Sequence, residues 1–496
     1  MKKVYLTFIG LLMVMLVSAQ QNILIQNDFW KKNPSVSTIK KAIKDGNSPV
    51  EKNSRSFDAT ALAILEGASV DAVDYLISLK EVSVNTRTHD GRTYLIWAAY
   101  KGNLPVIQLL LKKGADVSLK GTHGFDAINF AAFAGIDNKE LYDALINGGA
   151  DITQTNNDGA SAILLVASRV KDASLIDYFV SKGLDINSVD EEGNGIFNYA
   201  ARGGNIPLMK ILVDRGIAYK NTNKEGANAV LFAAKGTRRG APDLETFEFL
   251  ASLGLKMNTT DRIGNTPLTI ISGKAKNLEL INYFIKKGVE VNRVNEEGTN
   301  ALLSAAGNTI EIVERLATLT KDLNHANKDG VTALAIAMKY NSAEVVSMLL
   351  ERGASVDVND KDGNSILYYW ATTNSVRRSA TKVDQTKLAL LKKQGFDVAK
   401  AQPNGNNLFH IAVETENMDL LKLALAEDVD INAKNKEGYT PLLKAALLAK
   451  DTQILKFLVA NGADVKATTD FEESAYDLAS ENELLKEAKA SIEFLK

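Results

Sequence analysis

Polar turns and apolar segments alternate along this chain with a nearly constant period. Each period holds a polar turn with a central glycine, a short apolar segment and a second segment rich in leucine and isoleucine. The turn glycines are 32 to 35 residues apart, except for intervals of 38 and 42, and they are Gly91, Gly124, Gly159, Gly193, Gly226, Gly264, Gly298, Gly330, Gly363, Gly405 and Gly438. A period of this size predicts a solenoid, in which each unit buries its apolar face against the next copy.

The copy at residues 91–124 shows how one unit predicts two short helices. Thr93 is a suitable N-cap, and Gly102 ends the first helix because glycine readily adopts the left-handed conformation found there. Pro105 begins the second helix, where its missing amide hydrogen does no harm, and Gly114 ends it. The apolar face of the second helix consists of Val106, Ile107, Leu109, Leu110 and Leu111.

This pattern resembles the ankyrin repeat, whose phrase Thr-Pro-Leu-His-x-Ala-Ala is followed by a glycine, a leucine-rich helix and Gly-Ala-Asp. Close matches are Thr266-Pro267-Leu268, Thr440-Pro441-Leu442 and Gly462-Ala463-Asp464. The resemblance implies an all-α ankyrin-repeat solenoid of helix-turn-helix units joined by β-hairpin-like turns. Counting the caps, the phrase starts 13 times, at Thr60, Thr93, Asp126, Ser161, Gly195, Asn228, Thr266, Asn300, Thr332, Ser365, Asn407, Thr440 and Ser474.

The first residues have the pattern of a secretory signal peptide. Lys2 and Lys3 precede an apolar run from Val4 to Val17, and Ala19 is a small residue suited to cleavage. An uncleaved anchor is the alternative, but the run is shorter than the roughly 20 residues of a spanning helix. The mature protein is therefore expected to be periplasmic or secreted, without a membrane span.

The remaining chain is expected to be one array with distinct ends. A capping segment at 20–57 with one clear helix precedes twelve repeat units at 58–473, and a capping repeat occupies 474–496. Terminal units of a solenoid differ from the middle because one face meets solvent. The apolar face of the last unit is expected to contain Leu478, Leu484, Leu485, Ile492 and Leu495.

Composition limits the chemistry and the partners. The 58 basic and 60 acidic side chains give a net charge of −2, which provides no general attraction for nucleic acid or an anionic membrane. The chain has no cysteine, so disulfides, thiolate metal sites and cysteine nucleophiles are excluded. Phosphate-binding loops, nucleophile elbows and zinc-protease motifs are absent from the sequence. We expect a monomer without catalytic residues, metal or cofactor that binds another protein.

The histidines do not predict a catalytic cluster. His89, His123 and His325 fall in turns, whereas His410 lies in a first helix, where the ankyrin resemblance implies a bond to the adjacent turn. A metal site at His89 and His123 is the alternative, disfavoured because two imidazoles without an acid bind metal poorly. The turn at 154–159 imitates a calcium loop, but Leu165 stands where a bidentate acid is needed.

Partners of ankyrin-family proteins usually bind a concave surface formed by turn tips and the exposed sides of first helices. At the exposed ends of the first helices, this sequence carries a mildly basic, partly aromatic stripe suited to an acidic partner. The stripe consists of Tyr100, Lys101, Phe133, Arg169, Arg202, Lys235, Lys274, Lys339 and Tyr340, and Glu414 and Leu447 replace it in later repeats. The alternative is that cations at a helix C-terminus complement its dipole.

A second aromatic series is expected in the core. Its members take the leucine position of the ankyrin phrase, which packs between neighbouring repeats, and they are Trp97, Phe130, Tyr199, Phe232 and Tyr369.

The two long intervals indicate insertions between the two helices of a repeat. Residues 237–243 carry Arg238 and Arg239, and residues 373–387 carry Arg377, Arg378, Lys382 and Lys387. Next to the second insertion, Trp370 stands at a position that normally requires a small residue. The alternative to a scaffold is therefore a protein that binds or hydrolyses a small molecule or glycan at segment 365–390.

Overall fold

The computed structural model describes residues 22–238, 240–373 and 384–496. These residues form helices and isolated antiparallel bridges, as the all-α solenoid prediction requires. The chain divides into two compact units: unit 1 is Met1–Ala200 with Pro207–Ile217, and unit 2 is Ala201–Ile206 with Ala218–Lys496. The predicted leader at residues 1–19 lies outside the described residues. Within the described ranges, no helix is long and apolar enough to cross a bilayer.

The helices of unit 1, with α11 and α12 at the division, are η1 (Ile23–Ile25), α1 (Asn27–Trp30), α2 (Val36–Lys44), α3 (Ala59–Glu66), α4 (Val70–Ile77), η2 (His89–Gly91), α5 (Tyr94–Lys101), α6 (Leu104–Lys112), α7 (Ala127–Ala134), α8 (Lys139–Asn147), α9 (Ala162–Val166), α10 (Ser174–Ser181), α11 (Ile196–Gly203) and α12 (Ile206–Asp214). The helices of unit 2 are α13 (Ala229–Lys235), α14 (Leu244–Ser252), α15 (Pro267–Ile271), α16 (Leu278–Lys286), α17 (Ala301–Ala305), α18 (Ile310–Leu319), α19 (Ala333–Tyr340), α20 (Ala343–Glu351), α21 (Ile366–Ala371), α22 (Gln385–Lys393), α23 (Leu408–Glu414), α24 (Met418–Ala426), α25 (Pro441–Leu448), α26 (Gln453–Ala460), α27 (Ala475–Glu481), α28 (Glu483–Glu487) and η3 (Glu493–Leu495).

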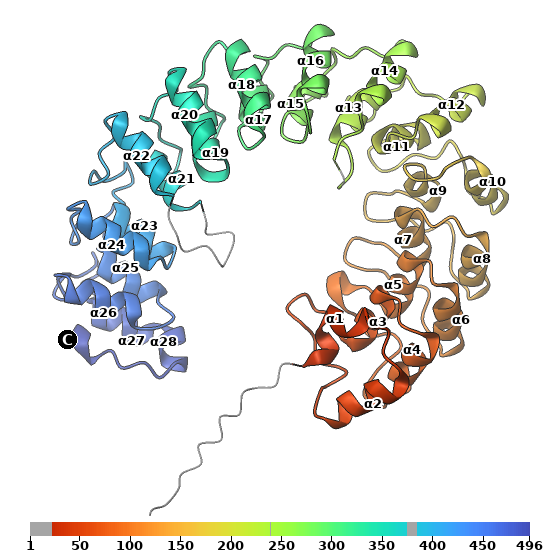
Figure 1. Cartoon of the computed structure of the whole chain (residues 1–496), viewed down its shortest axis with the longest axis horizontal. Helices are drawn as coiled ribbons and strands as arrows, with labels where there is room; N and C mark the ends of the chain where they lie inside the picture. Colours follow the sequence, from red (N-terminus) through yellow and green to blue (C-terminus); the bar gives the residue numbers. More distant parts are fainter. Residues whose placement is uncertain (1–21, 239, 374–383) are drawn as a thin grey trace, which may run out of the picture. The chain divides into compact units, whose positions relative to one another are not determined.

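Each unit consists of two helix layers (Figure 1). In unit 1, the first helices α3, α5 and α7 pack in succession, and so do the second helices α4, α6 and α8. Unit 2 repeats this order, with α13, α15 and α17 in one layer and α14, α16 and α18 in the other. The core lies between the layers and between successive pairs, so each repeat is completed by its neighbours.

Local signals at the helix ends explain where the helices begin and end. Thr93 caps α5 by accepting from the amide of Ile96, and Gly102 ends it with φ +68°. The second helix begins at Leu104, one residue before Pro105, because Asn103 is the N-cap. The first repeat begins at Asp58 rather than at Thr60, since the Asp58 side chain accepts from the amide of Ala61.

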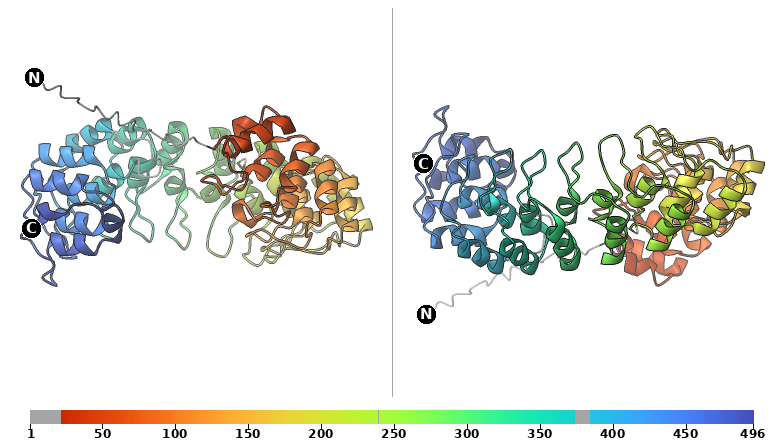
Figure 2. Two further views of the ribbon diagram at one scale, coloured as in Figure 1. Left: turned by 90° about the horizontal axis from the view of Figure 1, so that it is seen from below. Right: turned by 90° about the horizontal axis from the view of Figure 1, so that it is seen from above.

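The turns form a hydrogen-bonded series along one side of unit 2 (Figure 2). The amide of Lys328 donates to the Glu297 carbonyl at 2.9 Å, and the amide of Lys361 donates to the Asp329 carbonyl at 2.8 Å. Gly330, with φ +81°, lies so close to the next turn that an added Cβ would be 2.8 Å from Asp360 Cα. The turn glycine is therefore required both by its conformation and by the contact it permits.

Both ends of the array differ from the prediction in detail. The N-terminal cap contains two α-helices and the short 3-10 helix η1 rather than one helix: α1 packs on α3 and α2 packs on α4, and Trp30 is fully buried. In the C-terminal unit, Leu478, Leu485 and Leu495 are buried as expected, but Leu484 is 46% exposed. The five-residue helix α28 directs Leu485 inward and leaves Leu484 in solvent.

The two insertions lie between the helices of a repeat, as predicted. Residues 237–243 separate α13 from α14 and contain an antiparallel bridge between Thr237 and Gly240. The second insertion separates α21 from α22, but Lys387 belongs to α22 and is buried. The other predicted basic residues of the insertions, Arg239, Arg377, Arg378 and Lys382, lie outside the described residues.

Candidate functional site

The predicted stripe does lie at the ends of first helices, but it divides into separate groups. Lys101 and Lys235 are the last residues of α5 and α13, whereas Arg169 and Lys274 follow α9 and α15. The described contacts bring together an aromatic group in unit 1, a cationic group in unit 2 and a third group around Lys339. Lys101 is exposed and joins none of them through a described contact.

The aromatic group connects three repeats of unit 1. Tyr100 stacks on Phe130 with ring centroids 4.8 Å apart, and Phe133 lies parallel to Phe130 at 6.0 Å. The Arg169 guanidinium lies 5.6 Å from the Phe133 ring centroid, within the range of a cation–π interaction. Tyr100 is 37% exposed. The group therefore has a buried base and an accessible rim.

The cationic group of unit 2 consists of Arg202, Lys235 and Lys274. Arg202 Nε donates to the Gly236 carbonyl at 2.5 Å, and Lys274 Nζ donates to the Lys235 carbonyl at 2.9 Å. These carbonyls are at the C-terminal end of α13, so the predicted complement to the helix dipole has a direct structural basis. Burial, Arg202 and Lys235 lower the pKa of Lys274.

The third group contains Lys339 and Tyr340 at the end of α19. Lys339 Nζ lies 5.5 Å from the ring centroid of Tyr340 and 5.7 Å from that of Tyr368 in the next repeat. Tyr340 is 61% exposed. An ammonium held between two aromatic faces is fixed in position while the outer ring stays accessible.

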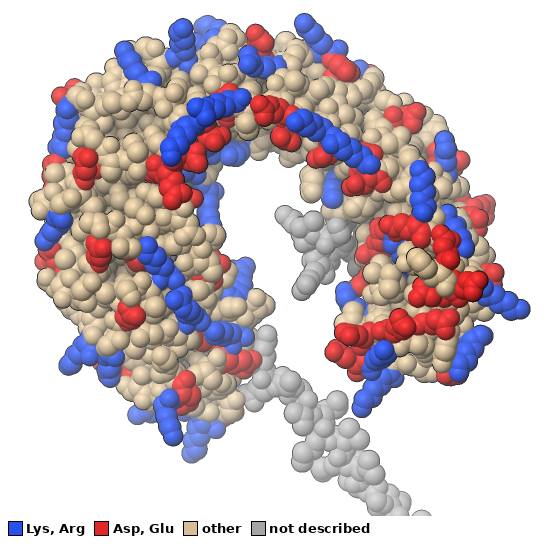
Figure 3. Space-filling view, turned by 180° about the vertical axis from the view of Figure 1, so that it is seen from behind, with Lys and Arg blue, Asp and Glu red and all other residues tan. Residues whose placement is uncertain are grey.

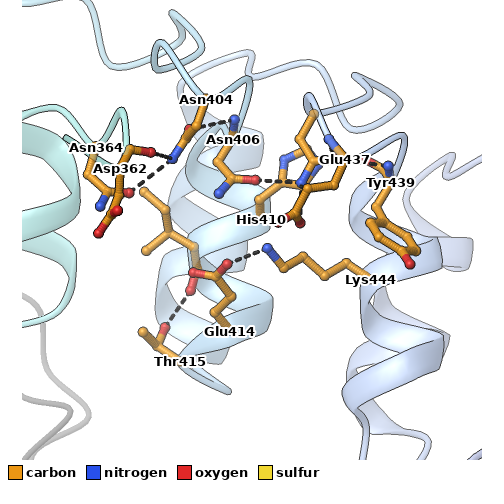
Figure 4. A network of polar contacts seen from close by, with 12 residues as sticks. Asp362, Asn364, Asn404, Asn406, His410, Glu414, Thr415, Glu437, Tyr439 and Lys444 are labelled. Carbon is orange, nitrogen blue, oxygen red and sulfur yellow. Dashed lines mark hydrogen bonds and ion pairs between the residues drawn. The ribbon is translucent and has the colours of Figure 1, made fainter. Parts of the chain in front are cut away.

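In a later repeat, the corresponding stripe position is acidic, and its side chain forms an ion pair with a lysine of the next repeat. Glu414 at the end of α23 forms an ion pair with Lys444 of α25, and the Lys444 side chain is largely buried (Figure 4). The Glu414 charge is therefore neutralised within the array. The surface at Glu414 differs from the cationic group, where the charges have one sign.

The face that carries the turns has mixed charge (Figure 3). Turn tips of unit 2 include Lys224 beside Glu225, Lys328 beside Asp329 and Lys361 between two aspartates. Because both signs alternate, the described residues of this face form no extended positive band of the kind that tracks a nucleic-acid backbone.

The second aromatic series is in the core, as predicted. Its five members are between 5% and 9% exposed: Trp97, Phe130, Tyr199, Phe232 and Tyr369. Several reach the turns with their polar ends, since Tyr199 Oη donates to Asp190 at 2.8 Å and Tyr369 Oη donates to Asp360 at 2.7 Å. These side chains join helices to turns and are not available to a partner.

Trp370 is also a core residue, contrary to the idea of a ligand pocket around it. Its side chain is 1% exposed, and its indole N–H donates to the Asp384 carbonyl at 2.9 Å. Lys387 is 2% exposed and donates from Nζ to the Met338 carbonyl at 2.9 Å. The ring and the amine, which the alternative function would place in a pocket, instead hold α22 against α19 and α21.

The histidines occupy the expected places. His410 is fully buried and its Nε2 lies 3.0 Å from the Tyr439 carbonyl oxygen of the next turn (Figure 4). An acid does accompany the other pair, since Asp90 Oδ2 lies 3.5 Å from His89 Nε2 and 4.0 Å from His123 Nε2. Arg92 also pairs with that carboxylate at 2.9 Å. Within the described part of the chain, no three His, Cys, Asp or Glu side chains are placed to hold a metal.

Two members of the aromatic group were not predicted from the sequence. Phe125 contacts both Phe130 and Phe133, and the Arg92 guanidinium lies 4.5 Å from the Phe130 ring centroid. Both residues directly follow a turn glycine. Phe125 packs on the first helix of its own repeat, and Arg92 packs on the first helices of its own and the next repeat. The position after a turn glycine is therefore the sequence signal that could have identified both residues.

Stacked helix pairs joined by glycine turns define a solenoid repeat protein. Sequence comparison agrees: the family profile described as "Ankyrin repeats (3 copies)" matches residues 31–121, 60–156, 128–223, 163–261, 230–327, 307–379 and 378–469. The chain belongs to the ankyrin-repeat family. Ankyrin repeats generally mediate protein–protein interaction.

The curated relatives are larger proteins with varied names. The chain is 28% identical to alpha-latroinsectotoxin-Lt1a of Latrodectus tredecimguttatus over 64% of its length, and 22% identical to the human transient receptor potential cation channel subfamily A member 1 over 83%. It is 28% identical to the phosphocholine transferase AnkX of Legionella pneumophila over 59%. The chain spans 23% to 31% of the length of these relatives. The region of similarity to these relatives lies in the ankyrin-repeat array of this chain.

Proposed function

We propose that this chain is a non-catalytic, exported ankyrin-repeat scaffold that binds one partner protein through its first-helix ends and turn tips. The observation that supports this most is that nearby positions of one first helix differ sharply in exposure to solvent. In α19, Met338 is fully buried while Tyr340, two residues later, is 61% exposed. The inner position stabilises the array and the outer one is available for recognition.

Several observations support the separate parts of this proposal. The basic start, the apolar run and Ala19 support export to the periplasm or the medium. The mixed charge of the turn face favours a protein over a nucleic acid as the partner.

Capture from the native cell envelope tests the binding function. The chain from residue 20 onward is immobilised, incubated with periplasmic and culture-medium fractions, and bound proteins are identified by mass spectrometry. We expect one specific protein, lost with the stripe variant Lys101→Glu, Lys339→Glu. The control variant Lys112→Glu, Lys286→Glu carries the same charge change on second helices. Capture of no specific protein, or equal loss with both variants, would contradict the proposal.

The N-terminus of the protein recovered from cells tests export independently. We expect the mature chain to begin at Gln20 and to appear in the periplasm or medium. A chain retaining Met1 inside the cell would contradict export and leave the binding experiment unaffected. Light scattering of the purified chain tests the expected monomer.

A further inference from the structure

Three successive repeats of unit 2 direct cations to one place. Arg202 comes from the last turn of α11, Lys235 is the last residue of α13, and Lys274 follows α15. The carbonyls at the end of α13 connect them, because Arg202 and Lys274 bond to adjacent carbonyl oxygens, those of Gly236 and Lys235. We call these three residues the cation cluster.

The cation cluster is rigid on its inner side. The Arg202 guanidinium lies 5.2 Å from the centroid of the buried Phe232 ring. Gly236 has φ +60° and ψ −164°, a conformation restricted to glycine, and an added Cβ would lie 2.4 Å from the Gly240 carbonyl oxygen. The conformation of Gly236 therefore fixes the direction in which the chain leaves α13, and with it the carbonyl that holds Arg202.

The cluster retains unused hydrogen-bond capacity on its outer side. An arginine has five N–H donors and a lysine has three, and the two carbonyl bonds use one donor of Arg202 and one of Lys274. Across residues 22–238, 240–373 and 384–496, no carboxylate forms an ion pair with Arg202, Lys235 or Lys274. Glu414, at the corresponding position of a later repeat, shows the opposite arrangement with its partner Lys444.

Like charges at this place repel one another. Burial contributes most to the lowered pKa of Lys274, and the charges of Arg202 and Lys235 lower it further. An anion placed between the three side chains would remove this repulsion and satisfy the outer donors.

The surroundings indicate which anion fits. A recess of about 210 Å³ adjoins Lys274, and its lining includes Lys276 but also the acidic residues Asp243, Glu245 and Glu279. These carboxylates would repel a long polyphosphate chain that continued past the cluster. A short group of carboxylates that ends at the cation cluster does not reach these acidic residues.

We propose that the cation cluster is the anchor for a short acidic segment of the partner, with its Asp or Glu carboxylates bound between Arg202, Lys235 and Lys274. This inference rests on the proposed scaffold function and gives the partner its chemistry. The Arg202 guanidinium offers its planar Nη groups to one carboxylate, and the two ammonium groups bind the next.

A defined peptide tests the anchor without knowledge of the partner. Fluorescence anisotropy at low ionic strength measures binding of a labelled peptide of alternating Glu and Ser to the chain from residue 20 onward. The same peptide with Gln in place of Glu and a single-stranded DNA of equal charge serve as comparisons. The test variant is Arg202→Gln, Lys235→Gln, Lys274→Gln. The control variant Lys256→Gln, Lys286→Gln, Arg293→Gln changes exposed cations of the same unit and gives the same net charge.

We expect the test variant to weaken binding of the Glu peptide about tenfold, as three exposed charge pairs allow, and the control variant to change it little. Raising the salt concentration should weaken binding to the wild type more than to the test variant. NMR of ¹³C-methylated lysines should show the pKa of Lys274 rising when the Glu peptide binds. Thermal unfolding of both variants shows that each is folded.

Three results would overturn the inference. These are equal peptide binding by wild type and test variant, equal loss in both variants, and cluster-dependent binding of DNA more tightly than peptide. If the envelope experiment captures a partner equally with wild type and test variant, the acidic anchor is wrong and the scaffold function stands. If no partner is captured, the scaffold function fails whatever the peptide shows.

Discussion

The Nε2 atom of His410 lies 3.0 Å from the carbonyl oxygen of Tyr439, so one imidazole joins a first helix to the turn of the next repeat. The carbonyl can only accept, so Nε2 carries the proton, and Nδ1 accepts from the Asn407 amide at 3.2 Å. The ring is fully buried in its neutral form.

This arrangement predicts loss of stability in mild acid. Burial is the main cause that lowers the pKa of His410 to about 4; the bond to Tyr439 opposes this shift and the nearby Lys444 adds to it. The unfolded chain takes up the proton near the ordinary value of 6.5, so stability falls as the pH drops from 6.5 towards 4, by on the order of 3 kcal/mol at most. Urea unfolding of wild type and His410→Gln across this range measures the effect. A wild-type pH dependence identical to that of the variant would contradict it.

Replacing Trp370 with alanine should strongly destabilise unit 2. The side chain is 1% exposed and its N–H bonds to the Asp384 carbonyl, so its loss leaves a cavity and an unsatisfied acceptor. We expect a cost of about 3 to 5 kcal/mol in the free energy of unfolding. Tyr340→Ala, at a 61% exposed position, should cost less than about 0.5 kcal/mol. Denaturant unfolding of the two variants distinguishes a core residue from a surface one, and a mild effect at Trp370 would favour a ligand role after all.

Two glycines with positive φ allow the cost of backbone strain to be distinguished from the cost of lost contact between turns. Gly330 has φ +81° and its added Cβ would be 2.8 Å from Asp360 Cα, whereas Gly353 has φ +94° and nothing within 4 Å. Gly353→Ala should cost about 1 kcal/mol from conformation alone. Gly330→Ala should cost appreciably more, because the next turn must move. Equal costs in chemical denaturation would show that turn contacts do not contribute.

The buried pair of Tyr94 and Asp58 provides another test. Tyr94 Oη donates to Asp58 Oδ2 at 2.7 Å, and burial raises the pKa of Asp58. Tyr94→Phe removes the donor and leaves a buried carboxylate oxygen unsatisfied, which should cost about 1 to 3 kcal/mol of stability. Tyr340→Phe, which removes an exposed hydroxyl, is the control. No difference between the variants in urea midpoint would contradict this prediction.

Helix ends and turns were predictable because their causes are local. A glycine with positive φ and a capping side chain act within a few residues, so the glycines and most N-caps are where the sequence places them. The repeat boundary at 58 agrees with the N-cap Asp58, but the phrase start at Thr60 falls two residues later because both residues are capping types. Which of them caps α3 depends on how the rest of that helix packs.

Side-chain direction was less predictable because it depends on neighbouring repeats. Leu484 and Leu485 are adjacent in a short helix, and only packing against the previous unit decides which one is buried. The unusual volume of Trp370 favours the alternative of a pocket, but its ring is buried and its N–H reaches the Asp384 carbonyl, a contact across 14 residues that the sequence does not indicate. For the candidate site, the sequence indicated the stripe, but it did not indicate that Arg202 and Lys274 bond to the same helix end.

The bonds between successive turns join main-chain atoms, as in the pair formed by the Lys361 amide and the Asp329 carbonyl. At tip positions other than the turn glycines and the asparagines that bond to the previous turn, the side chain does not set the spacing of the tips. A substitution at a tip can alter what is recognised while the pitch of the row stays the same. Such a chain can exchange one partner for another by point changes, without redesign of the framework that presents them.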